Sequence, residues 1–169
     1  MTAPRRVVTG HDAGGRSVVV SDAPAPKSHS LPGATFHELW NTTEMPAPIA
    51  PVESTDPTGR PLVTPPSPNG TIIRVVDLEP GSRSPMHRTE TTDYGVVLTG
   101  DVVLVLDDGS ETPLRAGDMV VQRGTDHAWV NPGDEPARMV FVLVDGRFTA
   151  ELRALLPGEP ELFDHAVGE

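Results

Sequence analysis

The sequence predicts an all-β protein whose centre is a single antiparallel β-barrel of the jelly-roll type. Between Thr71 and Asp145, short β-prone segments alternate with turns about every ten residues, a spacing typical of sandwiches and closed barrels. No helical pattern lies between these segments, which argues against alternating strand–helix units. No internal repeat is visible either, so we expect one barrel and not two.

Each barrel strand is expected where apolar and β-branched residues run together between turn signals. Gly100-Asp101 is one such signal, because glycine adopts positive φ easily and aspartate accepts hydrogen bonds from nearby backbone groups. The expected strands are Thr71–Leu78, Met86–Thr89, Tyr94–Thr99, Val102–Leu106, Met119–Gln122, Ala128–Asn131 and Ala137–Val144.

The chain before Thr71 has a different character. Residues 5–20 are expected to form a hairpin, residues 21–34 a loop and residues 36–40 a short strand. From Met45 to Gly70 the chain carries eight prolines and almost no periodic apolar pattern, which predicts a long arm or lid.

After the barrel, apolar side chains at helical spacing over residues 147–156 predict a short helix that stops at Pro157-Gly158, followed by an acidic tail. The chain is therefore divided into an N-terminal hairpin and Pro-rich arm at 1–70, the barrel core at 71–145, and the helix and tail at 146–169.

Charge and composition exclude several classes of partner. The chain has 13 Lys and Arg against 24 Asp and Glu, a formal net charge of −11, so its surface repels phosphate backbones and anionic lipids. We therefore expect neither nucleic acid nor a membrane as partner. No apolar run approaches the ~18 residues that span a bilayer, and the first residues lack the apolar stretch of a secretion signal, so a cytoplasmic location is expected. With no Cys, the chain has no disulfide and no thiolate ligand.

The residues that carry chemistry gather in two segments of the expected barrel. In an extended strand, side chains two residues apart share a face. The first segment is therefore expected to present His87, Thr89 and Asp93 on one face. By the same alternation, His127 and Trp129 share a face in the second segment.

Both segments resemble the motifs of the cupin family, specifically of its small single-domain members. The first cupin motif runs Gly, five residues, His-x-His, three residues, Glu, six residues, Gly, and the second ends Pro-x-Gly, two residues, His, three residues, Asn. The resemblance spans roughly residues 71–145 and implies a cupin-type barrel. The corresponding positions here are Gly81, His87, Thr89, Asp93 and Gly100, then Gln122, Gly124, His127 and Asn131.

The resemblance also implies a metal site, because cupin metal sites usually carry three His and one Glu. In this chain Thr89 stands at the second His and Asp93 at the Glu. His87, Asp93 and His127 remain, which is the ligand set of non-haem Fe(II) sites that leave positions open for substrate and O₂. The expected cofactor is a divalent transition metal, Fe first, with Mn, Ni and Zn as alternatives.

Two alternatives to a metal site stay open at this point. In one, a histidine and Asp93 exchange protons with the substrate without a metal. In the other, the histidines only satisfy hydrogen bonds inside a barrel that has lost its site. His87, Asp93 and His127 are the catalytic candidates in any enzymatic case.

Four residues are expected to contact a substrate. Trp129 would wall the pocket and stack on an aromatic ring, or belong to the core. Gln122 would hydrogen-bond a ligand, or end a strand. Thr89 would hold a metal-bound water. Gly95, in phase with Asp93, would leave space beside the site, or bend its strand.

The arginines of the expected strands and the other histidines are expected outside the barrel. One strand arginine facing inward would select a carboxylate or enolate, but the solvated exterior is the expected place for Arg74, Arg88 and Arg138. Four histidines without a partner at ligand spacing are expected on the surface: His11, His29, His37 and His165.

Cupins resembling this chain include dioxygenases, isomerases, cyclases, dehydratases and ligand-binding proteins, and small single-barrel members frequently tailor aromatic or polyketide natural products. The resemblance implies a metal-dependent enzyme that acts on a small, partly apolar organic substrate by oxygenation or metal-assisted proton transfer. The alternatives are a metal-free isomerase, cyclase or dehydratase, and a ligand-binding protein without turnover. We also expect a homodimer, because several cupins pair their barrels edge to edge.

Overall fold

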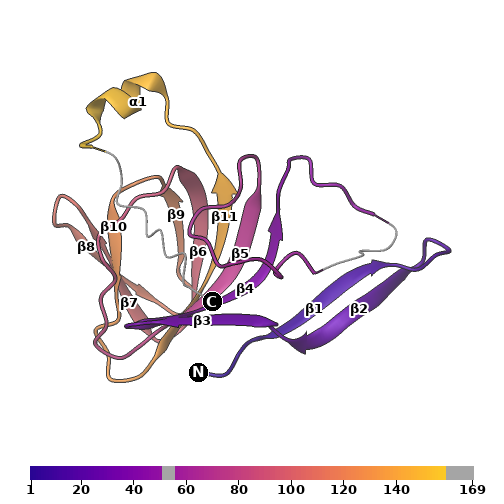
Figure 1. Ribbon diagram of the computed structural model, residues 1–169. Coiled ribbons are helices and arrows are strands. Elements are labelled where there is room, and N and C mark those ends of the chain that lie inside the picture. Colours follow the sequence, from indigo (N-terminus) through magenta and orange to yellow (C-terminus); the bar gives the residue numbers. More distant parts are fainter. Residues whose placement is uncertain (51–55, 159–169) are drawn as a thin grey trace.

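The computed structural model describes residues 1–50 and 56–158, which are built mainly of β-strands (Figure 1). The elements in chain order are β1 Arg5–His11, β2 Ser17–Pro24, β3 Lys27–Leu31, β4 Ala34–Thr42, β5 Thr71–Leu78, β6 Thr91–Thr99, β7 Asp101–Leu106, β8 Glu111–Arg115, β9 Met119–Arg123, β10 His127–Val130, β11 Ala137–Asp145 and α1 Ala150–Leu155.

Two sheets form the walls of the barrel. The larger has the strand order β3-β4-β5-β11-β6-β9 and the smaller the order β10-β7-β8, and all paired strands are antiparallel. Both sheets contribute side chains to one buried core, so they face each other. The all-β antiparallel barrel predicted from the sequence is confirmed. The core cluster consists of Val76, Leu78, Val97, Val102, Leu114, Trp129, Ala137 and Met139.

Strand β5 lies in the middle of the larger sheet, paired with β4 on one side and β11 on the other. Its branched apolar residues suit a strand that has neighbours on both edges. Val76 and Leu78, two residues apart, face the core as strand alternation requires. Arg74 lies two residues before Val76, so the same alternation brings its charged side chain to the inside of the barrel.

The hairpin predicted at residues 5–20 is confirmed as β1 and β2, and Figure 1 shows it projecting to one side of the barrel. Arg6 connects it to the rest of the chain. The Arg6 guanidinium donates to the carbonyl oxygen of Leu39 at 3.1 Å and forms an ion pair with Asp56.

Two edge strands differ from the sequence prediction. Residues 21–34, predicted as a loop, contain the end of β2 and the whole of β3. Strand β8 was missed because Pro113 removes a backbone donor, which argues against a central strand. Both β3 and β8 are edge strands, where one row of backbone groups needs no partner, so polar or proline-containing segments suffice.

The strand predicted at Met86–Thr89 is wrong, because this segment holds only an isolated bridge between His87 and His127. The predicted C-terminal helix is present but begins at Ala150. Thr149 caps it, its Oγ1 accepting from the backbone N–H of Leu152 at 3.2 Å.

The Pro-rich segment before Thr71 forms no strand or helix over residues 43–50 and 56–70. Its residues Leu62, Val63 and Thr64 lie against the barrel cavity described below. Across the described ranges, no helix has both the length and the apolar character needed to cross a membrane.

Candidate functional site

A cavity of about 420 Å³ lies inside the barrel and is lined by residues of both sheets. Small-molecule sites typically have volumes of roughly 300–1,000 Å³. Most of the lining side chains are apolar, which suits an organic molecule with an apolar body. The apolar lining includes Leu62, Val76, Trp129, Phe141 and Leu143, and the polar lining includes Arg74, His87, Thr89, Asp93 and His127.

His87 and His127 stand side by side on the cavity wall. The backbone N–H of each donates to the carbonyl oxygen of the other, both at 2.9 Å. Their ring centroids lie 4.2 Å apart with the planes inclined by 49°. His127 begins β10, which pairs with β7, whereas His87 lies in the segment between β5 and β6. The fold therefore brings together two histidines that are far apart in the sequence.

Both imidazoles are held through the same nitrogen. Nδ1 of His87 donates to the carbonyl oxygen of Pro85 and Nδ1 of His127 to that of Thr125, each at 3.0 Å. Burial lowers the pKa of His127 to about 4, where the neighbouring His87 adds to the effect and the Thr125 carbonyl opposes it. Burial also lowers the pKa of His87, against the Pro85 carbonyl and the charge of Asp126. At neutral pH both rings are therefore uncharged, with the lone pair on Nε2.

Asp93 enters the cavity from β6. Its side chain is buried, and its Oδ1 has no hydrogen-bond partner within the described part of the chain. Burial raises the pKa of Asp93 to about 6, although the Thr91 hydroxyl and the charge of Arg74 act in the opposite direction. Thr89 also lines the cavity, and its hydroxyl shares a 2.7 Å hydrogen bond with that of Thr91.

Gln122 lies next to His127, and its side-chain amide contacts Nδ1 of that ring. Gln122 is also the cross-strand neighbour of Asp93 in the β6–β9 pair. Its direct contact is thus with the His127 ring, whose Nδ1–H already donates to the Thr125 carbonyl oxygen. Its substrate contact stays a prediction.

Trp129 and Gly95 shape the cavity wall. The Trp129 ring lies 5.7 Å from that of His127 and 5.3 Å from that of Phe141, measured between centroids. Trp129 both lines the cavity and belongs to the core cluster. A Cβ at Gly95 would come within 2.9 Å of Phe141 Cε1. The space beside Gly95 is therefore filled by the Phe141 ring, which itself lines the cavity.

The exterior predicted for the strand arginines is wrong at two positions. Arg74 is 5% exposed and lines the cavity. Arg88 is 2% exposed and forms an ion pair with Asp126. Arg138 forms a partly buried ion pair with Asp77. The spacing of Arg74 from the apolar residues of its own strand was a usable signal for its inward position.

The surface position predicted for His37 is also wrong. Its ring is buried between Ser28 Oγ, 2.6 Å from Nδ1, and Asp77 Oδ2, 3.1 Å from Nε2. His29 lines the cavity. His11 ends β1 in the hairpin, and His165 lies outside the described residues.

A transition metal at this site would need several ligand side chains arranged around one ion. Among the described residues, no group of three His, Cys, Asp or Glu side chains is arranged to hold one ion. Only part of the predicted ligand set is thus assembled, namely the imidazoles of His87 and His127. The two Nε2 lone pairs suit a transition metal, and the Nδ1–H bonds to carbonyl oxygens are those that metal-binding histidines usually make.

Comparison with known proteins gives clear relatives. The family model described as "Cupin domain" matches residues 74–143. Phomopsin biosynthesis cluster protein C' of Diaporthe leptostromiformis is 40% identical over 87% of this chain and 81% of its own length. The cupin-domain-containing oxidoreductase fogC of Aspergillus ruber is 37% identical over 83% of this chain and 71% of its own length.

Among solved structures, AerE from Microcystis aeruginosa superposes with a TM-score of 0.50 at 22% identity, over 73% of this chain and 47% of that one. At that identity the likeness concerns the fold alone. The barrel, the two motif histidines on its inner wall and the long alignments with cupin-domain proteins agree. The chain belongs to the cupin family.

Proposed function

We propose that the protein is an enzyme of natural-product biosynthesis that binds a small, largely apolar organic molecule in the barrel cavity and transforms it beside His87 and His127. The observation that carries the proposal is the imidazole pair, two uncharged rings on the wall of a cavity of ligand size. The relatives' names support this setting, since two are phomopsin biosynthesis cluster proteins and another is a cupin-domain-containing oxidoreductase.

For this chain we propose a divalent transition metal: Fe first, with Mn and Ni as alternatives for oxidation chemistry, and Zn, which has no redox chemistry, as an alternative for Lewis-acid chemistry alone. His87 and His127 would hold it through Nε2, because each Nδ1 already donates to a backbone carbonyl. When bound, the metal would supply Lewis-acid or O₂-activating chemistry at the substrate. Asp93 is the carboxylate proposed for the same centre, as a ligand or as a proton carrier at Oδ1.

The protein's own side chains have separate tasks in this proposal. The apolar wall around Trp129 and Phe141 would bind the substrate body and exclude water. The Thr125 carbonyl oxygen would hold the His127 ring in one orientation by accepting from its Nδ1–H.

A second candidate function is metal-free proton transfer, as in an isomerase, cyclase or dehydratase. It is favoured by one observation, the buried Asp93 Oδ1 that has no partner in the described part of the chain and faces the same cavity as two neutral imidazoles. A carboxyl and an imidazole on one cavity provide an acid and a base for a substrate held between them.

The experiment uses chelator-treated protein that is resupplied under nitrogen with Fe(II), Mn(II), Ni(II) or Zn(II) and a panel of phenols, 1,3-diketones and aromatic acids. Air is then admitted, O₂ uptake is followed with an electrode, and products are identified by mass spectrometry. Product with O₂ uptake supports oxygenation, and product without metal and without uptake supports metal-free proton transfer.

His127→Ala should abolish either reaction, and His11→Ala, which removes a hairpin histidine, is the matched control. Binding without product in every arm would contradict an enzyme and leave a ligand-binding cupin.

A further inference from the structure

Arg74 is a buried cation on the cavity wall. It lies on β5 directly opposite Glu38 of β4, and its side chain is 5% exposed. A guanidinium stays charged at any physiological pH. Burying such a charge costs free energy unless it is paired and its N–H groups are hydrogen-bonded. The groups that contact Arg74 therefore indicate whether the protein alone satisfies its charge and its N–H donors.

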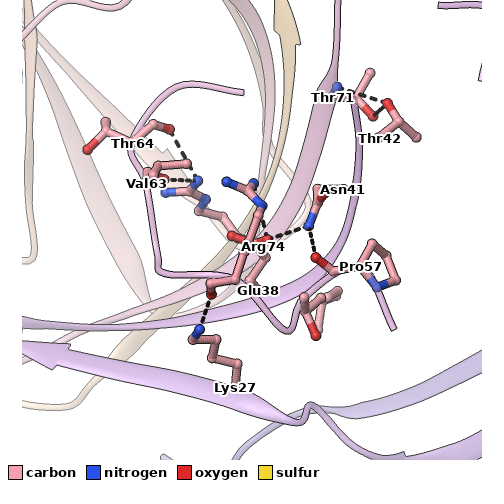
Figure 2. A network of polar contacts seen from close by, with 12 residues as sticks. Lys27, Glu38, Asn41, Thr42, Pro57, Val63, Thr64, Thr71 and Arg74 are labelled. Carbon is pink, nitrogen blue, oxygen red and sulfur yellow. Dashed lines mark hydrogen bonds and ion pairs between the residues drawn. The ribbon is translucent and has the colours of Figure 1, made fainter. Parts of the chain in front are cut away.

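The protein partners of Arg74 are neutral (Figure 2). Its Nη2 donates to the carbonyl oxygen of Val63 at 2.8 Å and to that of Thr64 at 3.1 Å. Its Nε is buried and has no acceptor within the described part of the chain. Among those residues, no carboxylate lies within ion-pair distance of this guanidinium. Arg74 is thus held by two carbonyl groups and keeps donor capacity.

The nearby acidic group, Glu38, contacts other residues through Oε1, and its Oε2 is buried without a hydrogen-bond partner in the described part of the chain. Glu38 Oε1 accepts from the Asn41 side-chain amide at 2.8 Å and lies 3.3 Å from Nη2 of Arg60. Two guanidiniums, those of Arg60 and Arg74, therefore share the field of one buried carboxylate. Asp93 adds a second acidic group to the field of Arg74. Within the described part of the chain, neither carboxylate forms a direct hydrogen bond to the Arg74 guanidinium, whose acceptors are the two backbone carbonyl groups.

We infer that Arg74 is the recognition residue for an organic oxyanion, so that the cavity takes a substrate with an apolar body and an acidic oxygen group, a carboxylate or a phenolate. The apolar lining receives the body, and the Arg74 guanidinium receives the oxyanion. The inference rests on the proposed function in that it names the class of substrate for the same cavity.

Arg74 also positions the cavity wall. Val63 and Thr64, whose carbonyl groups accept from Arg74, line the cavity together with it. An anion bound to Arg74 therefore sits beside a segment that is tied to the same guanidinium. Removal of the guanidinium should weaken anion binding and loosen this segment. A lysine would keep the charge but lose the planar set of N–H donors that can bind two oxygen atoms at once.

The test measures binding, not turnover, by quenching of tryptophan fluorescence with calorimetry as a check. The carboxylate arm compares 2-naphthoate with the neutral isostere 2-naphthamide, and the phenolate arm compares 4-nitrophenolate with 4-nitroanisole, both at pH 8. The wild type should bind one of the anions about tenfold or more tightly than its neutral counterpart, as expected for a charged hydrogen bond in a buried site. The arm that shows the preference identifies the acidic group.

In Arg74→Gln the preference should fall to about one, and in Arg74→Lys it should be intermediate. Arg138→Gln is the matched control, because Arg138 pairs with Asp77 and lies outside the cavity lining, and it should keep the wild-type preference. Equal affinities for anion and neutral probe in both arms of the wild type would overturn the inference, and this comparison needs no variant to fold. A preference that survives in folded Arg74→Gln would overturn it too.

The binding test separates this inference from the proposed function. If the protein turns over a substrate in the oxygen-uptake experiment but shows no anion preference, the proposed enzymatic function stands and the recognition role of Arg74 is refuted. If it shows anion preference but no turnover, Arg74 stands as a ligand-binding residue and the proposed enzymatic function is refuted.

Discussion

His87 and His127 are joined by two backbone hydrogen bonds of 2.9 Å, and their imidazole rings lie 4.2 Å apart. The contact ties the segment that precedes β6 to the start of β10, so the distance between the rings is set by the backbone and not by side-chain rotamers alone. A pair held in this way is expected to act as one unit.

The first prediction concerns that unit. If the two rings share one metal or one substrate, His87→Ala, His127→Ala and the double variant should lose activity or metal affinity to a similar extent. Isothermal titration with Zn(II), together with the turnover assay, measures both properties. His11→Ala in the hairpin should behave like the wild type. Losses that simply add in the double variant would show that the two imidazoles act separately.

The second prediction concerns Gly95 and Phe141. A methyl group at Gly95 would meet Phe141 Cε1 at 2.9 Å, so Gly95→Ala should destabilise the barrel by about 2 kcal/mol through overpacking. Phe141→Leu should recover part of that loss in the double variant, because it removes the ring edge that the methyl group meets. Urea unfolding measures both effects.

Gly59→Ala serves as the control for this pair, since its Cβ would lie at an ordinary 3.4 Å from the Asp56 carbonyl oxygen. Equal losses for Gly95→Ala in the presence and absence of Phe141 would contradict the packing explanation.

The third prediction concerns pH and Asp77. Burial would raise the pKa of Asp77, but the Arg138 guanidinium and His37 outweigh it, so the folded-state pKa lies below the ordinary value of 3.8. A carboxyl with a lowered pKa stabilises the fold above its unfolded-state pKa and loses that contribution as the pH falls through the folded-state pKa. Asp77→Asn should therefore cost about 2 kcal/mol at pH 7, and the cost should shrink below pH 3.8.

Urea unfolding at pH 7 and at about pH 3 tests this expectation. Asp22→Asn breaks the exposed ion pair with Arg5 and should have a smaller effect at pH 7, because solvent screens that pair. A cost for Asp77→Asn that is the same at both pH values would contradict the role of the charge.

Much of the barrel was predictable because its central strands combine a β-prone local sequence with the apolar pattern that a strand between two neighbours needs. The predicted bounds of β5 match the structure at both ends, since its apolar residues serve a strand with two neighbours. The edge strands β3 and β8 were not predictable in this way, because their sequences need to satisfy only one neighbour and tolerate Pro113 or several polar residues.

The spacing of the motif residues predicted which side chains of the candidate site face the cavity. His87, Asp93 and His127 all line the cavity. Spacing does not determine whether the shorter carboxylate of Asp93 joins the imidazoles in one ligand group. Arg74 was misplaced because a lone arginine in a strand usually points to solvent, although Ile72 and Val76 on the same face indicated the interior.

The fourth prediction concerns the homodimer expected from the sequence. The outer face of β6 and β9 carries exposed Tyr94, Leu98, Met119 and Val121, with Tyr94 and Val121 directly opposite each other. Among the described residues, strand β9 is also an edge of the six-stranded sheet, so an apolar face and a strand edge without a neighbour in that part of the chain coincide. We propose that a second copy of this chain covers both by two-fold pairing of the same face, since two identical patches can match each other.

Light scattering after gel filtration should then give twice the chain mass of 18.0 kDa. Val121→Asp should shift the protein toward the 18.0 kDa monomer, because it would place a charge from each chain in the contact of an already acidic protein. Val19→Asp, which adds the same charge to an exposed position of the hairpin, should leave the dimer intact. A wild type that elutes as a monomer would contradict the dimer, and a dimer lost only in Val19→Asp would move the contact from the barrel to the hairpin.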